Sequence, residues 1–213
     1  MALTMRTSSE HFSKRHGTMM NPKMFEETTM VHDSQAVIRI ARAYHFAADR
    51  HVSHRRKGEA AEPYMNHLTE VAELVAVATA GEDSELVIAA VLHDTLEDTS
   101  TTASELSHLF GPTVAGLVAE VTDDKALPKA ARKELQIQHA STASRNAQII
   151  KLADKIANLR SLAASPPADW DLTRIEDYGR WALQVVDQCR DADAGLAAEF
   201  DEALSALGKS SQT

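Results

Sequence analysis

The chain has few of the residues that interrupt or cross-link a fold. Its 213 residues include one cysteine, eight glycines and six prolines. A single cysteine excludes an internal disulfide framework, which fits a reducing cytoplasm. Because glycine and proline are scarce, there are few helix breakers, and long stretches of chain can stay helical. We therefore expect a cytoplasmic protein built largely from helices.

Features of membrane and nucleic-acid-binding proteins are also missing. No apolar run is long enough to cross a bilayer, and no apolar segment follows the basic N-terminal residues as it would in a secretory signal. The formal net charge is −9, whereas nucleic-acid surfaces depend on clustered positive charge. We expect neither a membrane nor a nucleic-acid partner. An anionic small molecule remains compatible, because a bound cation and a local basic cluster can override the global sign.

The remaining composition is that of a globular protein. Hydrophobic residues make up 44% and charged residues 25% of the chain, and a chain of this length can bury a sizeable core. Apolar residues recur at three- and four-residue spacing, with no alternation of strand period. Segments 84–98 and 148–162 are strongly apolar and should be central. The pattern predicts an all-α domain, a bundle of roughly eight or nine helices.

The N-terminal segment differs from the rest of the chain. Residues 1–33 are polar and contain six of the seven methionines. We expect a flexible tail there, a folded domain at 34–207 whose first helix is capped by Ser34, and a C-terminal tail at 208–213. The internal methionines that would serve as a later translation start are Met20, Met24 and Met30.

The sequence VLHDTLEDT places a cluster of ionisable side chains in an otherwise apolar segment. The cluster consists of His93, Asp94, Glu97 and Asp98. On one continuous helix, residues four apart share a face, so His93 would lie above Glu97 and Asp94 above Asp98. Carboxylates this close repel one another, and a divalent cation would remove the conflict.

Two other helical segments offer further ligands for such a cation. His67 follows PYMN at the start of one, and Asp154 lies in the apolar segment IIKLADKIANL with Asn158 four residues later. A buried aspartate is costly without a partner. Taken singly, a hydrogen-bonded histidine and a salt-bridged aspartate explain these residues equally well. The order His, His-Asp, Asp on separate helices is more specific, and it predicts one metal site. The predicted ligands are His67, His93, Asp94 and Asp154.

This order of motifs resembles the HD phosphohydrolase superfamily, and the flanking residues resemble the RelA/SpoT alarmone hydrolase domain. The matching segments are HRRKGEAAEPYMNHLTEVA, LHDTLEDT, FGPTVAGLVAEVTDDKALPK and KLADKIANLRSL. The resemblance runs from about residue 37 to residue 190 and is greatest to the small, hydrolase-only members related to the metazoan SpoT homologue. Leu68 stands where the family often has proline. Leucine weakens the preset first helical turn but leaves the His67 imidazole in place.

The resemblance implies an enzyme that removes the 3′-pyrophosphate of guanosine tetra- and pentaphosphate with Mn²⁺, and so opposes the stringent response. A nitrogen and oxygen ligand set without thiolate suits Mn²⁺ or a similar metal. By resemblance, Glu97 positions or deprotonates the attacking water and Asp98 assists the leaving 3′-oxygen. The division stays open because neighbouring carboxylates titrate together. The predicted substrate contacts are Arg56, Lys57, Lys129, Asn158 and Tyr178. For Lys129 a surface lysine, and for Tyr178 a core tyrosine, is the competing interpretation.

Two other functions fit the same residues. The metal site would also suit pppApp or the 2′-phosphate of NADPH, since each presents a phosphorylated ribose. A non-catalytic nucleotide-binding module would retain the fold without the reaction. Loss of a metal ligand, Glu97 or Asp98 would favour the module, and all of these residues are present.

Overall fold

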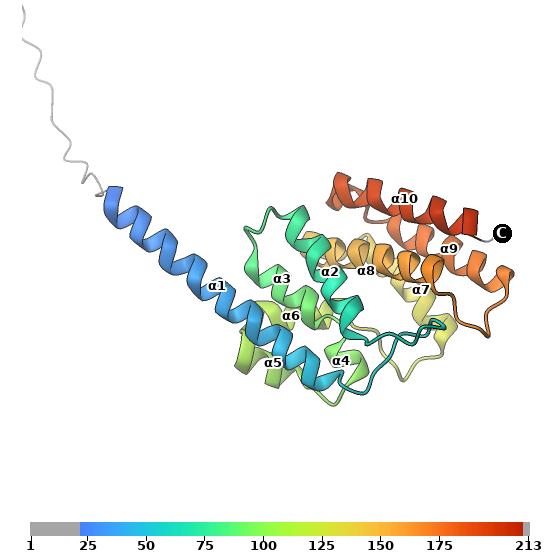
Figure 1. The fold of residues 1–213 in the computed structure, drawn as a ribbon, viewed down its shortest axis with the longest axis horizontal. Helices are drawn as coiled ribbons and strands as arrows, with labels where there is room; N and C mark the ends of the chain where they lie inside the picture. Colours follow the sequence, from blue (N-terminus) through green and yellow to red (C-terminus); the bar gives the residue numbers. More distant parts are fainter. Residues whose placement is uncertain (1–21, 211–213) are drawn as a thin grey trace, which may run out of the picture. The chain divides into compact units, whose positions relative to one another are not determined.

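Helices make up the part of the chain that the structure describes (Figure 1). A computed structural model describes the backbone of residues 22–210 and the side chains of residues 34–209. The chain divides into two compact units after Gln35, and the larger unit, Ala36–Thr213, carries the site. The helices are α1 (Pro22–Arg50), α2 (Met65–Ala78), α3 (Ser84–Leu92), α4 (Thr95–Asp98), α5 (Ala103–Phe110), α6 (Pro112–Val121), α7 (Lys129–Ala140), α8 (Arg145–Ala164), α9 (Leu172–Val186) and α10 (Ala194–Ser210), with a 3-10 helix at Arg190–Ala192. The all-α prediction is confirmed.

The histidine-aspartate pair of the HD motif lies in a break between two helices. α3 ends at Leu92 and α4 begins at Thr95, so the prediction of one helix from 84 to 98 is wrong. The ring Nδ1 of His93 lies 2.8 Å from the carbonyl oxygen of Ala90, which in a continuous helix would accept the amide of Asp94. The side chain thus contacts a carbonyl that the backbone would otherwise use. The break turns both side chains of the pair toward the other ligands.

Two helix boundaries differ from those expected. α1 begins at Pro22, well before the predicted start at Ser34, and proline suits the first turn of a helix. α10 continues to Ser210, past the predicted end at 207. Residues 1–21 and 211–213 of the two predicted tails lie outside the described part of the chain. The domain boundaries therefore stay predictions.

Helices α3 and α8 form the centre of the larger unit, as their apolar sequences predict. α8 packs against α2, α6, α9 and α10, and α3 packs against α2 and α6 (Figure 1). Leu92 on α3 and Leu152, Ile156 and Leu159 on α8 are fully buried. Burying each such side chain contributes about 1.5–3 kcal/mol. The backbone on both sides of Asp154 is therefore held firmly by core packing.

The basic loop between α1 and α2 folds back onto the C-terminal end of α8. The amide of Ala60 donates to Ser165 Oγ at 3.0 Å, and the amide of Glu59 donates to the Pro166 carbonyl at 3.3 Å. Gly58 makes this approach possible, because a Cβ there would lie 2.2 Å from the Ser165 carbonyl oxygen. The contact holds Arg56 and Lys57 close to the face of α8 that carries Asp154.

Replacing Gly58 should disturb this contact. We expect Gly58→Ala to lower the free energy of unfolding by about 1–3 kcal/mol, the usual cost of overpacking. Gly116→Ala is the matched control, because Gly116 lies on the exposed side of α6 with open space around its Cβ position. This control should stabilise the protein by about 0.5–1 kcal/mol. Urea unfolding measures both, and equal stability of Gly58→Ala and the wild type would contradict the close approach.

Candidate active site

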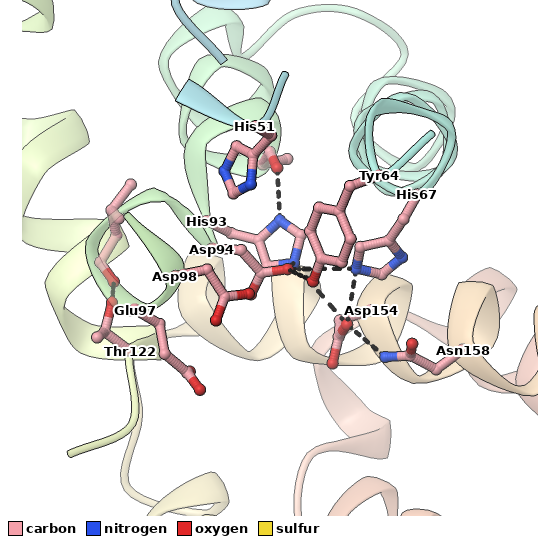
Figure 2. A network of polar contacts seen from close by, with 12 residues as sticks. His51, Tyr64, His67, His93, Asp94, Glu97, Asp98, Thr122, Asp154 and Asn158 are labelled. Atoms are coloured by element: carbon pink, nitrogen blue, oxygen red, sulfur yellow. Dashed lines mark hydrogen bonds and ion pairs between the residues drawn. The ribbon is translucent and has the colours of Figure 1, made fainter. Parts of the chain in front are cut away.

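The four predicted metal ligands meet at one point, although they come from three parts of the chain (Figure 2). Nε2 of His67 lies 3.5 Å from Asp94 Oδ2 and 3.3 Å from Asp154 Oδ1. Nε2 of His93 lies 3.1 Å from Asp94 Oδ2 and 3.8 Å from Asp154 Oδ1. Two imidazole nitrogens and two carboxylate oxygens therefore face a common centre.

Each helix presents its ligand for a local reason. His67 lies in the first turn of α2 and is buried beside Leu68, which itself packs in the core. Leu68, which stands where the family often has proline, therefore does not turn the His67 imidazole away from the cluster. His93 and Asp94 occupy the break between α3 and α4, and Asp154 lies mid-way along α8. The structure brings these four residues together, and their role as metal ligands stays a prediction.

The donor set fits a divalent cation. His67, His93 and Asp154 each offer a ligand atom within 4.8 Å of the other two. Because the Ala90 carbonyl can only accept a hydrogen bond, Nδ1 of His93 carries a proton, and Nε2 is the ring nitrogen that can bind a cation once it has lost its own proton. That Nε2 is buried and has no hydrogen-bond partner among the residues with described side chains. Imidazole and carboxylate together suit a borderline metal such as Mn²⁺, Fe²⁺ or Zn²⁺.

The charges of the cluster are strongly coupled. Burial opposes ionisation of Asp94, but His93 and His67 hold the pKa of this carboxyl well below its usual range. Burial would lower the pKa of His93, yet Asp94 and Asp154 raise it to about 10. A proton on His93 therefore balances the carboxylates when no cation does. A cation that binds His93 must displace this proton, so metal affinity should rise with pH.

Neighbouring side chains orient the two carboxylate ligands. The Tyr64 hydroxyl donates to Asp94 Oδ2 at 2.6 Å. Lys155 Nζ donates to Asp154 Oδ2 at 2.7 Å, and Asn158 Nδ2 donates to Asp154 Oδ1 at 2.6 Å. Against the cost of burial, Lys155 is the main group that holds the pKa of Asp154 well below its usual range. Such partners fix the direction in which a ligand offers its lone pairs.

Glu97 and Asp98 lie beside the cluster on α4 (Figure 2). Glu97 accepts the amide of Asp123 at 3.3 Å, and its Oε1 lies 3.3 Å from Arg132 Nη1. Burial, and then the negative charges of Asp94 and Asp123, raise the pKa of Glu97. Asp98 is ion-paired with Lys125. Two carboxylates thus stand next to the ligands in different electrostatic surroundings.

The cluster opens into a cavity of about 930 Å³. All of the predicted substrate contacts line this cavity, namely Arg56, Lys57, Lys129, Asn158 and Tyr178. Tyr178 is half-buried, lines the cavity and also packs against the core, so both interpretations of this residue stay open. Burial and the nearby charges of Arg174 and Lys57 lower the pKa of Lys129. Cations therefore gather around the cavity, in contrast to the net charge of the whole chain.

Comparison with known proteins agrees with this geometry. Residues 43–177 match the family model described as the HD domain. The chain belongs to the HD-domain family. Two relatives named guanosine-3′,5′-bis(diphosphate) 3′-pyrophosphohydrolase MESH1 are each 43% identical to it. The one from Drosophila melanogaster matches over 76% of this chain and 91% of its own, and the one from Homo sapiens over 77% and 89%.

A solved structure also resembles this HD domain. It is that of a metazoan orthologue of SpoT that hydrolyses ppGpp, with a TM-score of 0.76 and 41% identity, over 80% of this chain and 96% of that one. The RelA/SpoT resemblance drawn from the motifs is thereby confirmed. In the same HD domain, none of the helices with described residues is both long and apolar enough to cross a membrane.

Several residues of this HD-domain site escaped sequence reasoning. Tyr64 and Lys155 contact the metal ligands directly, and each stands within three residues of one in the sequence, which was the available signal. On the cavity wall, Lys133 Nζ lies 4.5 Å from the centre of the Trp181 ring. His51 and His54 lie beside Tyr64, and burial lowers the pKa of His51 to about 4. His54 begins the matching segment HRRKGEAAEPYMNHLTEVA, which was the available sequence signal.

Lys155 should control metal affinity through Asp154. We expect Lys155→Met to weaken Mn²⁺ binding by about 10- to 100-fold, the usual effect of losing a group that orients a ligand. Lys151→Met is the matched control, because Lys151 is buried one turn earlier on α8 and no hydrogen bond or ion pair joins it to a ligand. Calorimetric titration with Mn²⁺ measures both variants. An equal loss of Mn²⁺ affinity in Lys155→Met and Lys151→Met would show that the effect comes from replacing any buried lysine of α8, and not from the contact with Asp154.

Proposed function

We propose that the chain hydrolyses the 3′-pyrophosphate of guanosine tetra- and pentaphosphate, releasing pyrophosphate and GDP or GTP. The observation that carries the proposal is one site in which His67, His93 and Asp154 can share a cation, Asp94 contacts both imidazoles, and two adjoining carboxylates face a cavity lined by cations. The named activity of the fly and human relatives and of the solved SpoT orthologue supports the same substrate. A cytoplasmic protein with this activity would lower alarmone levels and oppose the stringent response.

The metal ligands in this proposal are His67, His93, Asp94 and Asp154, and the cation is Mn²⁺. When bound, a cation of this class supplies Lewis acidity toward a phosphoryl oxygen and makes a water acidic near neutral pH. The chain's own contribution is to direct both His Nε2 atoms at the site and to hold both carboxylates ionised. Tyr64, Lys155 and Asn158 support this by fixing the carboxylate orientations.

Glu97 is the proposed base and Asp98 the proposed partner of the leaving 3′-oxygen. A raised pKa makes Glu97 a better proton acceptor from water than an ordinary glutamate. The Asp123 amide and Arg132 hold its carboxylate in one orientation. Asp98 and its partner Lys125 together offer a proton-bearing group close to the scissile bond.

The basic side of the cavity is proposed to hold the nucleotide. Arg56 Nη2 donates to Asn158 Oδ1 at 2.9 Å, and its guanidinium lies 5.9 Å from the centre of the Tyr64 ring. A guanidinium held in this way offers a plane for the base and N–H groups for ribose or phosphate oxygens. Lys57 and Lys129 would pair with phosphates, and Tyr178 lines the same cavity.

The deciding experiment is an anion-exchange product assay with Mn²⁺ and ppGpp, pppApp or NADPH in separate reactions. We expect GDP and pyrophosphate from ppGpp, and a loss of rate of about 10²- to 10⁴-fold in Glu97→Ala and in Asp98→Ala. Glu202→Ala, on the exposed side of α10, is the control that should keep full rate. Turnover of only pppApp or NADPH would overturn the substrate. No turnover of any of the three with Mn²⁺ bound would favour the non-catalytic module.

The pH dependence of the reaction tests the role of Glu97. A base must be unprotonated, so the rate should fall as the pH drops through its pKa, which lies above the usual 4.5. Asp123→Asn keeps the amide donor but removes a negative charge that raises this pKa. We expect the acid limb of kcat/KM to move to lower pH in this variant. Asp124→Asn, at an exposed position next to it, should leave the limb in place. An upward shift in Asp123→Asn would contradict the assignment.

A further inference from the structure

Two histidines that are not metal ligands lie between the basic loop and the cluster. Nδ1 of His51 and Nδ1 of His54 are 3.0 Å apart. His51 is only 1% exposed, and its ring stacks on Tyr64 with centroids 5.2 Å apart and planes 16° apart. Figure 2 shows His51 beside Tyr64 and above His93. Tyr64 in turn donates to Asp94, so the stacked pair is fixed against the site.

The contact between the two rings requires one N–H and one lone pair. If His54 donated, the proton of His51 would sit on Nε2. That Nε2 is buried and has no hydrogen-bond partner among the described side chains and backbone. A doubly protonated His51 would leave the same N–H unpaired. Unpaired buried N–H groups are rare and energetically costly. His51 is therefore the donor through Nδ1–H, and His54 accepts at Nδ1.

This assignment fixes what His54 offers to the cavity. A neutral imidazole that accepts at Nδ1 carries its proton on Nε2. His54 is half-buried and lines the cavity, and no hydrogen bond joins its Nε2 to any residue of the described part. Arg56 and Lys57 follow it in the same loop and line the same cavity. His54 thus lines the cavity together with groups that suit an anion.

We propose that His54 is a substrate-binding residue that donates its Nε2–H to a phosphate oxygen, and that His51 is a positioning residue that fixes this tautomer. The proposal rests on the proposed function, because the phosphate is that of the alarmone. A donor held in one tautomer binds without first redistributing its proton, so the site is preorganised. His51 acts only through His54 and touches no substrate.

The tautomer can be measured directly. Long-range ¹H–¹⁵N correlation spectra of the full chain, with Mg²⁺ in place of paramagnetic Mn²⁺, should show His54 protonated at Nε2 and bare at Nδ1. Addition of pyrophosphate should shift the His54 Nε2 resonance. In His51→Phe, which keeps the stacked ring but loses the donor, His54 should become a mixture of tautomers. Protonated Nδ1 on His54 in the wild type, or no shift with pyrophosphate, would overturn the proposal.

Kinetics supply the second readout. His54→Leu should raise the KM for ppGpp about tenfold or more, with kcat within about twofold, because the lost contact binds substrate and transition state alike. His54→Gln should restore most of the affinity, since an amide can accept from His51 and donate to phosphate. His51→Phe should raise the KM less than His54→Leu does, because part of His54 keeps the Nε2–H tautomer, and the double variant should be no worse than His54→Leu. His45→Leu, at an exposed site on α1, is the control.

The outcomes separate this proposal from the function on which it rests. Multiplying effects in the double variant, or an unchanged KM in His54→Leu, would overturn the histidine pair while ppGpp hydrolysis stands. Absence of ppGpp hydrolysis in the wild type would overturn the proposed function. The spectra with pyrophosphate would still decide whether His54 is a phosphate donor, because they need no turnover.

Discussion

The rest of the site depends on the negative charge of Asp154, in the middle of the central helix α8. Asp154 lies on α8 between residues that are fully buried in the core. Its negative charge is balanced by Lys155 and by the two histidines across the cluster. Removing one partner of such a set is costly, because it leaves an uncompensated charge in a poorly solvated place. His67 comes from α2, and His93 comes from the break between α3 and α4. The charge of Asp154 therefore helps to hold these two elements in position, and the same carboxylate is a predicted metal ligand.

The negative net charge of the chain and the basic lining of the cavity are compatible, because acidic and basic side chains gather in different places. Among the residues with described side chains, most aspartates and glutamates are exposed, whereas the loop after α1 and the start of α7 bring Arg56, Lys57 and Lys129 to one cavity. Burial, and then repulsion by neighbouring cations such as Arg174, lowers the pKa of Lys129. An anionic ligand would relieve that repulsion, and the acidic exterior disfavours nonspecific binding of nucleic acid. Selectivity for a small phosphorylated molecule follows from where the charges lie.

The sequence predicted the parts of this structure that are periodic or that require a partner. α3 and α8 were recognisable from their apolar residues, and the metal ligands from polar groups those helices could not explain. The break at His93 was not predictable from local propensity, because it arises from a side chain that contacts a carbonyl of its own helix. Lys155 and Tyr64 were missed for a related reason. Lysine and tyrosine residues have many structural roles. Only the contact of Lys155 with Asp154, and of Tyr64 with Asp94, reveals the part that each plays in the site. His51 and His54 depend on a ring-to-ring contact that no spacing rule describes.

The contacts also link the basic side of the cavity to the carboxylate cluster. Arg56 holds Asn158, and Asn158 holds the same Oδ1 of Asp154 that faces the two histidines. Asn158 thereby orients Asp154, while its own amide oxygen accepts from Arg56. Any ligand that engages the Arg56 guanidinium therefore acts on a residue that orients the cluster. The basic loop and the central helix are coupled through one short chain of hydrogen bonds.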